Sequence, residues 1–232
     1  MVKESDAVLG AKSGGPLHGY RIIDLTTMIS GPFATMILGD QGAEVIKVET
    51  PKQGDHVRAG GHRSGGLAAN FLNNNRNKRS IALDLKSKEG RDVLLRLAAG
   101  ADVFVQNFRP GVVERLGVGE ADIRAVRPDI VYVSLNGFGE SGPYAAKPTY
   151  DPIIQAVSGL ASVQGGSDES PPRLVRTIVP DKMTAVTAAQ AITAALLARA
   201  KSGEGQHVRL SMLDAVLAFL WSSDMGGQTF VD

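Results

Sequence analysis

Residues 21–49 have the sequence RIIDLTTMISGPFATMILGDQGAEVIKVE, and this stretch decides the fold class. The apolar run Arg21–Leu25 predicts a buried strand, and Glu44–Glu49 predicts a second one. Between them, Ser30–Pro32 is typical of a helix start, with a hydroxyl N-cap and a proline in the first turn, and the helix continues over Phe33–Asp40. A strand–helix–strand unit this compact favours two adjacent parallel strands, because such crossovers are nearly always right-handed.

The same alternation of apolar runs and helical segments continues downstream of this unit. Further strands are predicted at residues 80–85, 102–106, 130–134 and 206–210, and helices at 87–99 with Ser87 as N-cap, 112–116, 120–126, 182–201 and 213–221. This order predicts an α/β fold with a Rossmann-like, doubly wound and mostly parallel sheet flanked by helices.

Some segments depart from this pattern. Residues 1–18 are polar and are expected to form a flexible tail, and the glycine-rich residues 52–70 are expected to form a long loop. The chain after Gly142 is less regular up to the long helix at 182–201. That helix is apolar on most of its sides, which predicts burial in the core (Met183, Val186, Ile192, Leu196, Leu197).

The composition excludes several classes of function. With 232 residues, 43% hydrophobic and 21% charged, the chain is an ordinary globular mixture, and its net charge of +1 does not favour binding of nucleic acid or an anionic membrane. The absence of cysteine excludes thiolate catalysis and Cys-ligated metals, and the four histidines form no zinc-binding pattern. No uninterrupted apolar run reaches the length of a membrane-spanning helix, which is about 18 residues. We therefore expect a cytoplasmic protein without a metal.

Ligands of an open parallel sheet bind beyond the carboxyl ends of its strands. After the first strand, Thr26–Pro32 leads into a helix N-terminus that could hold an anion, although a plain capped helix is equally consistent with it. The absence of a G-x-G-x-x-G motif there argues against a nicotinamide or flavin cofactor. The basic run Asn73–Arg79 could bind phosphates or could be a solvated approach to a strand. Gln106–Gly111, with Arg115 close behind, is a further candidate for ligand contact.

Asp181 stands between Pro180 and the long helix. A carboxylate in this place is a favoured N-cap, worth about 1 kcal/mol. Such a carboxylate can also serve as a nucleophile, because carboxylates form covalent intermediates in several enzyme classes. Its local sequence does not decide between the two. Glu49, Asp84 and Asp151 are carboxylates of the same kind, and each is expected to be structural.

Several segments in series resemble the family III CoA-transferases, the group that includes formyl-CoA transferase and carnitine CoA-transferase. Each segment is weakly specific, but they occur in the family's order and cover nearly everything after Gly19. The matching stretches are residues 24–32, 38–49, 77–85, 107–111, 137–143, 150–151 with 155–159, 179–181 and 203–214.

The resemblance implies that Asp181 is the catalytic nucleophile and that Tyr150 lies near the reacting thioester. It also implies that coenzyme A, supplied as acyl-CoA, contacts a set of residues from the strand ends (Met28, Ile29, Lys78, Asn107, Phe108, Arg115, Leu116). Two positions differ from the family pattern. Ile29 replaces the glutamine of formyl-CoA transferase, which argues against oxalate-type specificity. Thr50 replaces an arginine near the CoA phosphates, so Lys47, Arg58 or Arg63 would supply that charge.

The reaction implied is transfer of CoA from an acyl-CoA to a carboxylic acid through a covalent aspartyl-CoA thioester on Asp181. A related group, the α-methylacyl-CoA racemases, carries a His-Asp pair where this chain has Tyr150-Asp151. Since racemisation needs a base on each face of the carbon, the missing imidazole favours the transferase. A racemase or epimerase, and a non-catalytic CoA-binding subunit in which Asp181 is only an N-cap, remain alternatives.

Members of this family are roughly twice as long as this chain. Residues 1–18 are therefore expected to be the tail, 19–215 the CoA-binding α/β large domain, and 216–232 the start of a linker to a small domain. The resemblance implies an interlocked homodimer, or a partner chain that supplies the carboxyl-terminal half.

Overall fold

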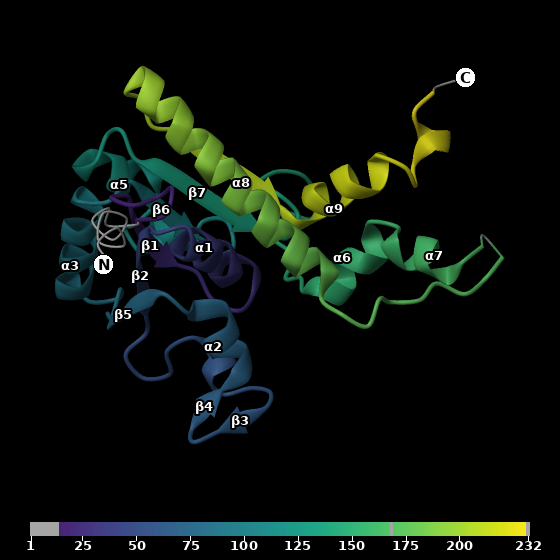
Figure 1. Cartoon of the computed structure of the whole chain (residues 1–232), viewed down its shortest axis with the longest axis horizontal. Coiled ribbons are helices and arrows are strands. Elements are labelled where there is room, and N and C mark those ends of the chain that lie inside the picture. The colour runs from purple at the N-terminus through teal and green to yellow at the C-terminus, as the bar shows by residue number, and fades with distance from the viewer. Residues whose placement is uncertain (1–13, 168, 231–232) are drawn as a thin grey trace, which may run out of the picture.

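The computed structural model describes residues 14–167 and 169–230, and its centre is a six-stranded sheet (Figure 1). The strand order is β5-β2-β1-β6-β7-β8, and every pair is parallel. The strands are β1 (Arg21–Leu25), β2 (Glu44–Glu49), β5 (Lys78–Ala82), β6 (Val103–Gln106), β7 (Val131–Asn136) and β8 (His207–Ser211). The predicted doubly wound sheet is confirmed. Its order reverses between β1 and β6, where the strand ends leave a crevice for a ligand.

Helices cover both faces of this sheet (Figure 1). On one face α1 (Ser30–Asp40) and α8 (Val179–Ser202) enclose one apolar cluster, which includes Ile22 and Val105. On the other face α3 (Lys88–Ala99) and α5 (Glu120–Val126) enclose a second cluster, which includes Ile23 and Phe104. Neighbouring residues of one strand enter opposite clusters because strand side chains alternate.

Two segments hold more structure than the sequence indicates. The predicted loop 52–70 contains η1 (His56–Arg58), a hairpin of β3 (Arg63–Ser64) and β4 (Leu67–Ala68), and the start of α2 (Ala69–Asn75). The irregular stretch after Gly142 contains α6 (Asp151–Val157) and α7 (Leu160–Gly165). These elements are short and gain their stability from tertiary packing, so local patterns detect them poorly. The remaining elements are α4 (Val112–Arg115), α9 (Met212–Trp221) and η2 (Gly226–Gln228).

The helix starts show how well caps can be predicted. Ser87 is the N-cap of α3 and accepts a hydrogen bond from Gly90 N at 3.0 Å, as expected. The prediction for Ser30 is wrong, because α1 begins at Ser30 itself and its N-cap, Ile29, makes no side-chain bond. Similarly, α8 begins three residues before the predicted start, with Ile178 as its N-cap.

The long helix α8 is buried on one side only. Ile192 and Leu196 are buried, but Val186 is 56% exposed and Leu197 is 60% exposed, so the expectation of burial on most sides is wrong. By length and composition α8 could cross a membrane, yet here its buried side packs on the sheet and on α1.

The ends of the described chain also differ from the predicted boundaries. The predicted tail extends to residue 18, but Leu17 is buried in the core, and residues 1–13 lie outside the described part. The predicted boundary at 215/216 falls inside α9, whose Val216 and Leu220 are buried.

Candidate active site

The candidate nucleophile lies where the first turn of α8 meets the beginning of α1. Asp181 is the third residue of α8. Its backbone N–H donates to Asp151 Oδ2 at 3.1 Å, which joins the N-terminus of α6 to that of α8. Gln155, one turn further along α6, donates from Nε2 to the other oxygen of Asp151 at 2.6 Å. Asp151 is thereby fixed beside Asp181.

The surroundings of Asp181 change its acidity. Burial, together with the nearby charge of Asp151, raises the pKa of the Asp181 carboxyl from 3.8 to about 6. The hydroxyl and the backbone N–H of Ser30 oppose this effect, because both donate to the charged form. The N-cap alternative for Asp181 is wrong, since the N-cap of α8 is Ile178. Ser30 is the first residue of α1, so the positive end of that helix lies at this carboxylate.

The loop between β1 and α1 is held in an uncommon conformation. Met28 has a φ of 69°, in the left-handed region that side chains rarely adopt. Its N–H donates to Asp55 Oδ1 at 3.1 Å. On the other side, the loop forms two hydrogen bonds with the side chain of Asn107. The N–H of Thr27 donates to Asn107 Oδ1 at 2.9 Å, and Asn107 Nδ2 donates to the carbonyl of Thr27 at 2.8 Å. Asn107 follows β6, so this clamp spans the reversal point of the sheet.

Two buried ion pairs lie beneath this loop. Lys78 Nζ contacts Asp24 Oδ2 at 2.9 Å, and Lys47 Nζ contacts Asp55 Oδ2 at 2.9 Å, with each of the four side chains at most 2% exposed. Burial raises the pKa of Asp24, but the two lysines outweigh it and hold that pKa well below its ordinary value. Both lysine charges are therefore paired inside the protein, and contact of Lys47 or Lys78 with coenzyme A stays a prediction.

Lys47 and Lys78 also donate to the backbone around the loop. Lys47 Nζ donates to the carbonyl of Thr26 at 2.8 Å, and Lys78 Nζ to the carbonyl of Pro32 at 2.8 Å. These bonds tie both ends of the loop to the sheet. The sequence shows that residues 47 and 78 are charged, but it does not show that their side chains are buried.

The remaining predicted ligand contacts surround the carboxyl end of β6. Phe108 and Leu116 are half-buried against the core, whereas Arg115 is exposed. Neither Arg115 nor the neighbouring Arg109 makes an ion pair within residues 14–167 and 169–230. Tyr150 is the N-cap residue of α6 and is 65% exposed, so its phenol is accessible to solvent.

The other basic side chains considered as phosphate ligands are mostly occupied. In the run 73–79, Arg76 pairs with Asp40 and Arg79 with Glu44, which favours the structural interpretation of that run. Arg58 forms two short bonds to Glu49 and lies over the ring of Phe71. Of the substitutes proposed for the missing arginine, only Arg63 has no carboxylate partner among the described residues.

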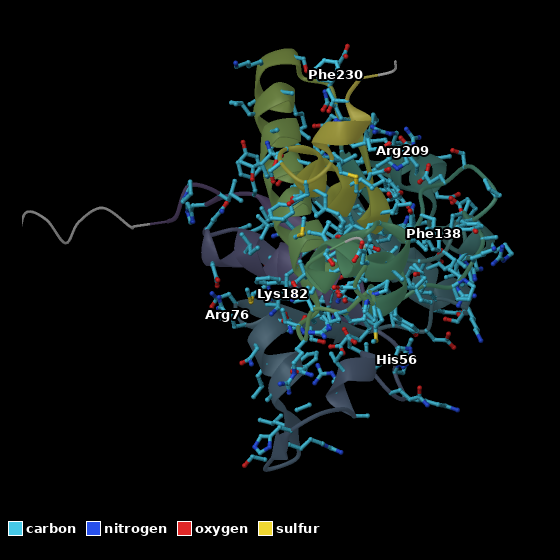
Figure 2. All side chains as sticks on the ribbon, turned by 90° about the vertical axis from the view of Figure 1, so that its right-hand side faces the viewer. His56, Arg76, Phe138, Lys182, Arg209 and Phe230 are labelled. Atoms are coloured by element: carbon cyan, nitrogen blue, oxygen red, sulfur yellow. The ribbon has the colours of Figure 1, made fainter. Side chains whose placement is uncertain are left out.

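Ser30 and Asp55 were not identified as site residues from the sequence, and Asp151 was expected to be only structural. The proline that follows Asp151 lies in the first turn of α6 and is a usable signal for a helix start there. No local signal indicates that Asp151 meets a residue 30 positions away. Within the described residues no group of three metal-ligating side chains comes together. Figure 2 labels Lys182, which follows Asp181, at the end of α8 near α1.

Comparison with known proteins identifies the family to which the chain is similar. The model of CoA-transferase family III matches residues 17–228. The chain is 42% identical over 210 residues to the acetyl-CoA:oxalate CoA-transferase of Acetobacter aceti, covering 90% of this chain and 54% of that protein. It is 43% identical over 206 residues to the succinyl-CoA:glutarate CoA-transferase of Mus musculus, covering 88% and 47%.

Solved structures agree with the sequence comparison. A CaiB/BaiF family protein from Brucella suis superposes with a TM-score of 0.87 at 35% identity, covering 93% of this chain and 58% of that one. The chain thus spans about half the length of the curated relatives it matches. The matched segment contains all of the sheet and both helix starts around Asp181. The chain belongs to CoA-transferase family III.

Proposed function

We propose that the protein transfers coenzyme A from an acyl-CoA to a free carboxylic acid, with Asp181 as the covalent nucleophile. The names of its relatives support the reaction class, since they act on acetyl-CoA or succinyl-CoA and on oxalate or glutarate. The described chain would bind coenzyme A, and the segments that relatives carry beyond the matched half would complete the active site. A cytoplasmic homodimer is part of the same proposal.

One observation carries this assignment. Asp181 is a desolvated carboxylate with a pKa of about 6, set against the N-terminus of α1. At pH 7 to 8 such a group is mostly ionised, yet it is a better nucleophile than an ordinary aspartate because its charge is poorly solvated. An aspartate that only stabilised a helix would not need Asp151 beside it, since that neighbour makes its charge less favourable.

The proposed chemistry has two symmetrical halves. An oxygen of Asp181 attacks the thioester carbonyl of the donor, the C–S bond breaks, and a mixed anhydride and CoA thiolate result. The thiolate then attacks the Asp181 carbonyl, which releases the donor acid and leaves an aspartyl-CoA thioester. The acceptor carboxylate repeats these steps in reverse. The N–H groups at the start of α1, including that of Ser30, supply donors for the oxyanion that develops in each step.

The loop at residues 26–29 would position coenzyme A. Asn107 fixes this loop from one side and Asp55 from the other, so Met28 and Ile29 present their backbone to the crevice in one conformation. Arg109 and Arg115 supply uncommitted positive charge at the end of β6 for the phosphates. Fixing the cofactor keeps the released thiolate close to the anhydride.

The racemase alternative is not favoured by the relatives, which are named CoA-transferases. The chain also has Tyr150 where racemisation would use an imidazole. The third possibility, a CoA-binding subunit without catalysis, predicts that Asp181 can be replaced without loss of turnover.

The test uses the full-length protein and a panel of acetyl-CoA or succinyl-CoA donors with short dicarboxylic acids. Asp181→Asn should reduce transfer by at least about 1,000-fold. The matched control is Asp214→Asn, because Asp214 occupies the same third position of α9 but is exposed. Transfer that survives in Asp181→Asn, or exchange of the α-proton without an acceptor acid, would reject the proposal.

A further inference from the structure

A second polar cluster lies on the face of the sheet opposite to α8. It lines a cavity of about 230 Å³ next to Tyr132, between the carboxyl-terminal parts of β6 and β7, the first residues of β8 and the beginnings of α4 and α5. Tyr132 belongs to the apolar cluster of the α3–α5 face, whereas α8 packs on the other face. Arg209, labelled in Figure 2, lines this cavity and pairs with Glu140 at 2.8 Å. Phe108 and Arg109 of its lining are shared with the proposed coenzyme A site, whereas Ser134, His207 and Glu120 have no role in the proposed transfer reaction.

Three of the lining side chains form a relay. Ser134 Oγ lies 2.8 Å from His207 Nε2, and His207 Nδ1 lies 2.5 Å from Glu120 Oε2. The strands β7 and β8 and the helix α5 bring these three residues together. The parallel pairing of β7 and β8 places His207 beside Tyr132, so the imidazole reaches along the strand to Ser134 on the same face. Glu120 is the first residue of α5, which starts beside this edge of the sheet.

The neighbouring hydrogen bonds determine where each proton lies. Phe108 N–H donates to Gln106 Oε1 at 2.8 Å, which fixes the orientation of that amide. Gln106 Nε2 therefore donates to Ser134 Oγ at 3.1 Å. Since an amide nitrogen can only donate, Ser134 Oγ is the acceptor in that bond, and its own proton is free to be donated to His207 Nε2. The neutral imidazole then carries its own proton on Nδ1, the nitrogen that faces Glu120.

The charges around His207 suit a general base. Burial lowers the pKa of His207, although Glu120 opposes that effect, so the ring is neutral at pH 7 and Nε2 can accept a proton. The other titratable groups that face it are Arg209, which lowers the pKa, and Glu140, which raises it. His207 Nδ1 is buried and has no aligned hydrogen bond, so the close carboxylate of Glu120 acts on it mainly through charge.

From this geometry we propose that Ser134, His207 and Glu120 form a serine-hydrolase centre for small carboxylic esters. His207 takes the hydroxyl proton as Ser134 Oγ attacks the ester carbonyl, and returns it to the alcohol that leaves when the C–O bond breaks. Water then attacks the acyl-serine, again giving a proton to His207, and the acid leaves as Ser134 regains its hydrogen. The cavity volume limits the acyl group to a few carbon atoms.

Donors for the developing oxyanion line the same cavity. Asn136 lies two residues after Ser134 on the same face of β7, and its Oδ1 accepts from Gly139 N, which leaves the Nδ2 amide as a donor. Arg109, which the proposed transfer reaction assigns to the coenzyme A phosphates, also lines this cavity and has no carboxylate partner among residues 14–167 and 169–230. Such donors stabilise the tetrahedral intermediate in serine hydrolases.

The test is carried out on the full-length Asp181→Asn protein, so that the transfer chemistry does not contribute. A fluorophosphonate probe should label one peptide, the one that contains Ser134, and p-nitrophenyl acetate should be hydrolysed. Ser134→Ala should abolish the label and slow hydrolysis by at least about 100-fold. Ser202→Ala, which changes an exposed serine at the end of α8, should leave both unchanged.

Two further variants separate catalysis from folding. In the protein with Asp181 intact, Ser134→Ala should retain CoA transfer, which shows that it has folded. If it does not fold, His207→Gln decides the matter, and it should reduce labelling of Ser134 by at least about 100-fold, with Glu120→Gln reducing it by about 10-fold. Labelling that persists in His207→Gln, a label on another residue, or no label on the folded protein would overturn the proposal.

Discussion

Replacing Asp181 by asparagine should stabilise the protein, because the substitution removes a charge that the fold holds under unfavourable conditions. The carboxyl has a pKa of about 6 in the folded state and an ordinary value of 3.8 when exposed. Asparagine has nearly the same shape and can still accept hydrogen bonds from Ser30. The burial penalty and the repulsion from Asp151 both disappear.

The size of this effect depends on pH in a way that can be calculated. Below pH 3.8 the carboxyl is protonated in both states, so the charge costs nothing. Between the two pKa values the folded state binds the proton more tightly, and stability of the native sequence falls as pH rises. The difference of about two pKa units amounts to about 1.5 kcal/mol at pH 5 and about 3 kcal/mol at pH 8.

The assay is denaturant unfolding of both full-length proteins at pH 5 and pH 8. The advantage of Asp181→Asn should roughly double between these values. The control is Asp214→Asn, in which an exposed aspartate at the same position of α9 is lost. Because the charge of Asp214 interacts favourably with the dipole of α9, its loss should lower the free energy of unfolding by about 0.3–1 kcal/mol. If Asp181→Asn is also destabilising at pH 8, Asp181 is not a strained carboxylate and the reasoning is refuted.

Three other consequences can be measured. The rate of CoA transfer should decline as pH falls through about 6, where Asp181 becomes protonated, and Asp151→Asn should shift this decline to lower pH in a pH–rate profile because it removes a nearby negative charge. An unshifted profile would contradict that role. Lys78→Met should cost about 3–5 kcal/mol in unfolding, because it leaves Asp24 charged and buried; adding Asp24→Asn should recover most of the loss. Asn107→Ala should raise the KM for acyl-CoA about 10-fold, since it removes two hydrogen bonds from the loop proposed to position coenzyme A, and an unchanged KM would contradict that role.

The four central strands, β2, β1, β6 and β7, were predictable because they are buried on both faces. A strand such as Val103–Gln106 is buried throughout and apolar in its first three residues, so it is recognised without knowledge of its neighbours. The helix Glu120–Val126 has the predicted bounds, since Pro128 ends the pattern just beyond it. The position of Asp181 at a helix start was also foreseen, although its place within the first turn was not.

The features that define the site depend on contacts between distant residues. Lys47 occupies one position of an apolar strand, and only the fold shows that its ammonium group reaches Asp55. The proximity of Ser30 to Asp181 follows from the packing of α1 against α8. Neither pairing has a signature in local composition, because charge and hydroxyl groups at these spacings are common on exposed surfaces. The resemblance to a family indicated Asp181 as the candidate nucleophile but did not reveal the neighbours that alter its acidity.

The central claim is that Asp181 becomes covalently acylated, and a trapping experiment tests it directly. The full-length protein is incubated with each acyl-CoA of the panel and quenched with hydroxylamine, and the peptide containing Asp181 is weighed. The account predicts a hydroxamate on Asp181 that forms only with acyl-CoA and is absent from Asp181→Asn. An unmodified peptide with every donor, from protein that binds coenzyme A and transfers it, would contradict the account.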